Sequence, residues 1–135
     1  MADDPVMTEI PVSVGELFDK ITVAEIMAKR VNNKTSVGRV HARLTELRRC
    51  ARKFTPDPEL VSQLRTVNEA IWAAHTRFKG KIAADCFDED YMFLARSIAN
   101  LHEERMTLRR DIDEAVTGTK SVDNSPSCAV LSYLV

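Results

Sequence analysis

A single arginine interrupts the longest apolar pattern in the chain. Between Asp88 and Val116, apolar residues recur at alternating spacings of three and four, and Arg105 stands at one of these positions. The spacing predicts a long helix with one buried face, so the guanidinium of Arg105 is expected to point inward. A guanidinium in that position needs an anion or an exit to a partner interface. The anion is either a ligand in a pocket of the fold or a carboxylate from an earlier helix, such as Asp19 or Glu25.

A second set of polar residues shares one helical face. Asn68, Trp72 and His75 follow one another at spacings of four and three, which places them side by side on a helix. They could line a polar cleft together with residues of an earlier helix: Asp19, Lys20, Thr22 and Glu25. The alternative is an ordinary seam between helices, with Trp72 in the core and His75 at its edge.

The segment between residues 39 and 53 is strongly basic. Against one acidic residue, Glu46, it contains six basic ones: Arg39, Arg43, Arg48, Arg49, Arg52 and Lys53. No aromatic residues alternate with them, and the whole chain has a formal net charge of -1. We therefore expect a solvated face or a patch that meets an acidic protein, and predict no nucleic-acid and no membrane partner.

No residue pattern indicates a metal site, a cofactor or a catalytic centre. The three cysteines, Cys50, Cys86 and Cys128, are far apart and odd in number, so neither a zinc site nor a disulfide framework follows. His75 and His102 lack the spacing of a metal-binding pair. No Gly-rich phosphate loop and no Ser/His/Asp order is present.

The last residues form an unusual segment. A polar stretch from residue 119 is followed by an apolar one, and an apolar end on a polar tether needs a surface to rest on. It docks on its own domain or a symmetry-related copy, or it is presented to a partner or a modifying enzyme. The residues of this possible modified core are Ser127, Cys128, Val130, Leu131, Ser132, Tyr133, Leu134 and Val135.

Apolar periodicity and capping residues predict four helices, over about residues 14–31, 37–54, 58–79 and 88–116. Ser13 and Glu16 have the form of a capping box at the first helix. Asp57 and Pro58 suit the start of the third helix, and Gly80 is placed to end it.

These elements predict an all-α fold, an antiparallel bundle of four helices whose apolar faces share one core. The 135 residues suit one domain. We expect an extended N-terminal arm at 1–12, the bundle at 13–118, and a flexible linker with an apolar tail at 119–135. The acidic N-terminus does not resemble a signal peptide, no apolar run is long enough to cross a membrane, and a cytoplasmic location is the expectation.

Three segments resemble a family of short bacterial helical proteins of unknown function. Residues 10–22 read I-P-V-S-V-G-E-L-F-D-K-I-T, residues 67–72 read V-N-E-A-I-W, and residues 94–97 read L-A-R-S. An arginine further along the last helix also matches, at Arg105. The resemblance implies a helical protein and gives no catalytic assignment. It indicates one ligand or partner cluster: Asp19, Lys20, Asn68, Trp72, Arg96 and Arg105.

Three functions remain open at this point. The first is a non-catalytic helical module that binds a protein through its bundle surface and apolar tail, the partner being another protein or a second copy in a homodimer. The second resembles the folded leader domain of a ribosomally synthesised peptide precursor, whose core at about 125–135 is altered by an enzyme such as a backbone N-methyltransferase. The third is a small all-helical enzyme that binds an anionic metabolite.

Overall fold

A computed structural model of the chain describes residues 6–117. It contains four helices, α1 (Val14–Arg30), α2 (Lys34–Ala51), α3 (Pro58–Ala83) and α4 (Glu89–Thr117), and no strand within the described range. The predicted all-α fold class is confirmed. Residues 6–12 are non-helical and exposed, whereas the expected tail at 119–135 lies outside the described residues.

Side-chain caps begin the helices at the predicted places. The Ser13 hydroxyl accepts a hydrogen bond from the Glu16 amide at 3.1 Å. Asp57 accepts from the Glu59 amide at 2.9 Å, with Pro58 as the first helical residue of α3. Asp88 accepts from the Tyr91 amide at 2.9 Å and so starts α4. Each cap satisfies an amide that has no partner inside its helix.

Three predicted boundaries are wrong. Helix α2 ends at Ala51 rather than residue 54. Helix α2 begins at Lys34 rather than residue 37, because the Asn33 side chain accepts from the Thr35 amide at 3.0 Å and provides the cap. Helix α3 continues past Gly80 to Ala83. Its end is set instead by Asp85, which has a left-handed backbone with φ of 55°. The Cys86 amide then bonds back to the Lys81 carbonyl at 2.9 Å, as in a Schellman motif.

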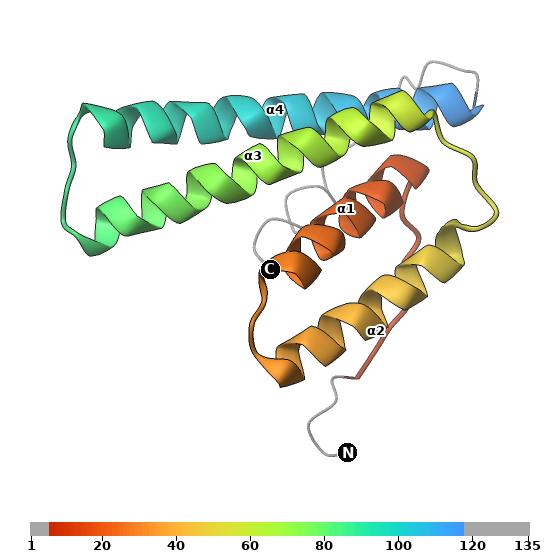
Figure 1. The fold of residues 1–135 in the computed structure, drawn as a ribbon. Helices are drawn as coiled ribbons and strands as arrows, with labels where there is room; N and C mark the ends of the chain where they lie inside the picture. Colours follow the sequence, from red (N-terminus) through yellow and green to blue (C-terminus); the bar gives the residue numbers. More distant parts are fainter. Residues whose placement is uncertain (1–5, 118–135) are drawn as a thin grey trace.

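The helices form two antiparallel hairpins that meet at α1 (Figure 1). Helix α2 packs against α1 alone, while α1 also contacts both α3 and α4. The molecule is therefore layered, with α1 between α2 and the α3–α4 hairpin. At 1.5 Å per residue, the 29 residues of α4 span about 43 Å. The far part of the α3–α4 hairpin extends beyond α1 and α2 (Figure 1).

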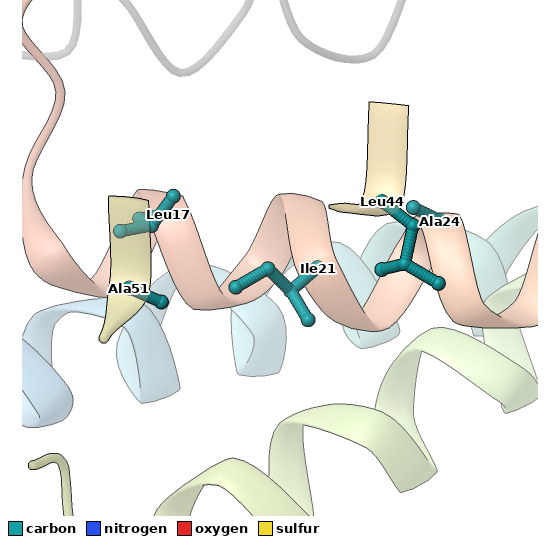
Figure 2. Packing of buried hydrophobic residues seen from close by; sticks show 5 residues of the cluster. All are labelled: Leu17, Ile21, Ala24, Leu44 and Ala51. Carbon is teal, nitrogen blue, oxygen red and sulfur yellow. The ribbon is translucent and has the colours of Figure 1, made fainter. Parts of the chain in front are cut away.

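The apolar core is divided in two, which corrects the expectation of one shared core. The first cluster joins α1 to α2, with Leu17 beside Ala51 and Ala24 beside Leu44 (Figure 2). The second joins α3 to α4 and is centred on Leu64 and Ile112, both fully buried. The apolar pattern of α4 also ends earlier than predicted, since Ala115 is exposed.

Gly15 permits the closest approach between α1 and α4. A Cβ atom placed on Gly15 would lie 2.1 Å from the carbonyl oxygen of Arg109. The Gly15 amide also donates to the Asp113 carboxylate at 2.6 Å. The absence of a side chain at this position therefore sets the distance at which the polar faces of the two helices meet.

Candidate functional site

Six polar side chains are buried where α1 meets α3 and α4. They share an exposure of 7% or less and come from three helices: Glu16, Asp19 and Thr22 of α1, Asn68 of α3, and Arg105 and Arg109 of α4. We call this set the buried polar network. Its formal charges balance, with two carboxylates against two guanidinium groups.

Asp19 accepts most of the hydrogen bonds in the buried polar network. Arg105 donates to it in a forked arrangement, with Nε 2.9 Å from Oδ1 and Nη2 2.6 Å from Oδ2. The Asn68 amide donates to Asp19 Oδ1 at 2.9 Å and to the Thr22 hydroxyl at 2.8 Å. Arg109 Nη1 lies 3.5 Å from Asp19 Oδ2. One carboxylate thus ties three helices together.

Glu16 has a different role from the one its sequence position suggested. Its backbone takes part in the predicted cap, but its carboxylate forms an ion pair with Arg109 Nη2 at 3.2 Å. The expected return bond to the Ser13 amide is therefore replaced by a contact with α4. The physical reason is burial. A buried guanidinium without a carboxylate is costly in free energy, whereas the exposed Ser13 amide can bond to water.

Of the two carboxylates that the sequence offered to Arg105, the structure pairs it with Asp19. Glu25 instead contacts two other arginines, with its Oε2 atom 3.1 Å from Arg65 Nε and its Oε1 atom 3.7 Å from Arg48 Nη2. Arg105 is 7% exposed, so its guanidinium is directed at a protein carboxylate within the fold.

The predicted cluster is brought together in part. Asp19, Asn68 and Arg105 are in direct contact. Lys20 on α1 and Trp72 on α3 are half-buried, and Arg96 is exposed on α4. Arg105 follows Arg96 by nine positions, a rise of about 13 Å along the helix. The eight predicted residues of the tail lie beyond the described part of the chain.

Arg109 and Glu16 are the members of the buried polar network that sequence reasoning missed as site residues. Arg109 follows Arg105 by four positions and Glu16 precedes Asp19 by three, so each shares a helical face with a predicted residue. This helical spacing could have indicated both residues from the sequence.

Two histidines lie next to the buried polar network. The rings of His75 on α3 and His102 on α4 meet edge to face, with centroids 5.9 Å apart. Burial lowers the pKa of His75 below its ordinary value, and the nearby Lys79 ammonium lowers it further. Burial also lowers the pKa of His102, with Arg105 and His75 acting in the same direction and Asp19 opposing them. Both rings are thus favoured in the neutral form near pH 7.

Two hollows on the surface of the described helices lie apart from the buried polar network. One pocket of about 320 Å³ lies between α1, α2 and the start of α3, and a groove of about 940 Å³ is lined by residues of α3 and α4. Of the six network residues, none lines either hollow. The side chains of the network pair with one another inside the fold, and we interpret the network as a charge-balanced contact that orients the helices.

Across residues 6–117, no three His, Cys, Asp or Glu side chains gather closely enough to hold a metal ion. None of the four helices combines the length and apolar composition of a membrane span. No family model matches the chain, and neither the curated proteins nor the solved structures contain a significant match to it.

Proposed function

We propose that this chain is a non-catalytic protein-binding module, and that the end of the α3–α4 hairpin is its contact surface. One observation carries the proposal. Four large apolar side chains are between 47% and 64% exposed at this end: Ile82, Phe87, Met92 and Phe93. We call residues 82–93 the hairpin tip. Clustered apolar surface of this kind is typical of protein interaction sites.

The fold supports presentation of the hairpin tip to a partner. The tip lies beyond the ends of α1 and α2 (Figure 1), so no other described helix competes for it. Phe78 and Tyr91 stack with ring centroids 4.8 Å apart, and Phe87 meets Tyr91 edge to face at 5.1 Å. An aromatic anchor held by its neighbours loses little conformational entropy on binding.

Ion pairs further fix the hairpin tip. Arg77 lies 2.9 Å from Asp90, and Lys81 lies 2.8 Å from Asp88. The Lys81 ammonium, with the Tyr91 amide and the Cys86 thiol, holds the pKa of Asp88 well below its usual range. Both ion pairs join the last turns of α3 to the start of α4 and so hold the two helices together next to the turn. The partner that fits is a protein surface with an apolar centre and a polar rim.

Site-specific photo-crosslinking in the producing cell tests this proposal. A photoreactive residue at position 93 should give a discrete adduct, either with another protein or with a second copy of the chain. The same residue at position 39, on the exposed face of α2, should give none. A Phe87→Ser/Met92→Ser variant, whose exposed side chains contribute little to folding, should melt normally and lose the adduct. Absence of an adduct at position 93, or its survival in this variant, would overturn the proposal.

A second candidate function rests on the composition of the segment after Thr117. The chain is then a folded leader domain followed by a peptide core at about 125–135, in which Ser127, Cys128 and several apolar residues are open to modification by a partner enzyme. Both apolar clusters are built from side chains of the four helices, so the helical domain has its own core. Intact mass of the protein from its native host distinguishes the two: added methyl groups or lost water within 119–135 support the leader, and an unaltered mass excludes it.

A further inference from the structure

The pocket between α1, α2 and the start of α3 has a composition suited to a ligand with two chemical parts. It has a volume of about 320 Å³, and its apolar lining includes Phe18, Phe54 and Val61. Three arginines, Arg48, Arg52 and Arg65, also line it, against one carboxylate. Its lining includes residues near the end of α2 and the start of α3, and the start of α3 is the end of that helix opposite the hairpin tip (Figure 1).

Two of the three arginines and the two phenylalanines lie toward different ends of this pocket. Helices α1 and α2 run antiparallel, with Leu17 opposite Ala51 and Ala24 opposite Leu44 (Figure 2). Glu25 and Arg48 therefore stand near one end of the pocket, where Arg65 joins them through its 3.1 Å ion pair. Phe18 and Phe54 stand nearer the other end. Arg52 stands at the apolar end, one helical turn after Arg48 and two positions before Phe54 on the same segment. A guanidinium therefore borders the apolar part of the lining.

The contacts of Glu25 show how a carboxylate sits between arginines of this pocket. Its two oxygens lie 3.1 Å from Arg65 and 3.7 Å from Arg48. Arg52 follows Arg48 by one helical turn and lines the same pocket. Within residues 6–117, the Arg52 side chain makes neither an ion pair nor a hydrogen bond. One guanidinium at the pocket is therefore available to a second carboxylate.

We propose that this pocket binds a small amphiphilic carboxylate, whose anionic head contacts Arg52 beside Arg48 and Arg65 and whose apolar chain lies against Phe18, Phe54 and Val61. The volume suits a medium-length alkyl or an arylalkyl chain and falls within the range of small-molecule sites. This inference is independent of the hairpin tip and of the peptide-core candidate.

Isothermal titration calorimetry of the full chain with sodium octanoate tests the proposal. Octanoate should bind with one-to-one stoichiometry. Acetate, which has the head without the chain, and octanol, which has the chain without the charge, should each bind at least about tenfold more weakly. Hexanoate should fall between octanoate and acetate, because it buries two fewer methylene groups. No octanoate binding, or equal binding of octanoate and octanol, would overturn the proposal.

Variants locate the site. Arg52→Gln should weaken octanoate binding by about tenfold, as expected for loss of a charged hydrogen bond. Arg39→Gln, at an exposed position of the same helix outside the pocket, should leave the affinity unchanged. In NMR spectra of the unaltered chain, octanoate should shift the amides of Ala51, Phe54 and Val61. Equal affinities of the two variants, or shifts confined to other residues, would show that the carboxylate does not bind here.

Discussion

Asp19 shows how one residue can determine the relative placement of three helices. It is 1% exposed and receives hydrogen bonds from Arg105 of α4 and Asn68 of α3. A buried carboxylate with these partners contributes little net stability compared with an apolar residue, but its loss removes one of the two carboxylates that balance two buried guanidinium groups. An arrangement of the helices in which Asp19, Asn68 and Arg105 are not in contact is therefore higher in free energy.

Replacement of Asp19 by Asn should reduce the free energy of unfolding by roughly 3–5 kcal/mol, because Arg105 and Arg109 then share a single buried carboxylate. Urea denaturation followed by circular dichroism measures the change. Glu103→Gln, at an exposed position of α4, is the matched control and should alter stability by less than about 0.5 kcal/mol. Similar values for both variants would mean that the buried polar network does not orient the helices.

Gly15 and Gly38 provide a second test at the residue scale. Gly15→Ala should destabilise the fold by about 1–3 kcal/mol, since the added methyl group would meet the Arg109 backbone and force α1 away from α4. Gly38→Ala should instead stabilise it by about 0.5–1 kcal/mol, because nothing lies within 4 Å of the added atom and alanine favours the helix. Thermal melts of the two variants should therefore shift in opposite directions. A shift in the same direction for both would contradict the close contact.

At the scale of the helices, the contact between α3 and α4 contains a pH-sensitive part. The rings of His75 and His102 meet across it, and the pKa of each is lowered from its ordinary value of 6.5, chiefly by burial. The unfolded chain therefore binds more protons than the folded chain just below pH 6.5. The contribution of the pair to stability is complete above that pH and is lost as the pH falls through the folded-state values.

The free energy of unfolding is accordingly expected to decrease between about pH 7 and pH 5.5. In His75→Gln this decrease should become smaller, because one of the two histidines with a lowered pKa is removed. His41→Gln, which removes an exposed histidine of α2, should leave the pH dependence unchanged. Urea titrations at several pH values measure the slope. A slope that is the same in all three proteins would rule out the histidine pair as its source.

At the scale of the whole molecule, α1 takes part in both apolar clusters. Leu17, Ile21 and Ala24 of α1 pack with α2, whereas Val14 packs against the cluster of α3 and α4. Helix α2 has no other helix as a neighbour. Loss of the α1–α2 contact should therefore be transmitted through α1 to the α3–α4 hairpin, so that the chain unfolds in one transition.

Leu44→Ala tests this coupling. Leu44 is 4% exposed in the α1–α2 cluster, and its truncation should cost roughly 2–5 kcal/mol. Far-UV circular dichroism follows all helices, while fluorescence of the only tryptophan, Trp72, reports on α3. Both signals should shift to the same lower urea concentration. Met92→Ala, at a half-exposed position of the hairpin tip, should shift neither. Separate transitions for the two signals would mean that α2 detaches alone.

The sequence alone was sufficient to predict the helices and most of their starts. Ser13, Asp57 and Asp88 each cap amides two or three positions away, and the apolar spacing of three and four is a property of single helices. These interactions are local, so the order of residues contains them. The Asn33 cap before α2 and the left-handed Asp85 after α3 were missed. Several nearby residues could have capped or ended these helices, and only the packed chain selects among them.

The partners of the buried charges were decided by the tertiary structure. Asp19 and Glu25 lie on the same helix and were equally available to Arg105, which stands 86 positions from Asp19. The rotation of α1 about its axis directs Asp19 to α4 and leaves Glu25 between Arg48 and Arg65. That rotation depends on the packing of Gly15 against Arg109 and on the layered order of the helices. Periodicity within one helix cannot specify such contacts, because they depend on the relative position of elements that are distant in the chain.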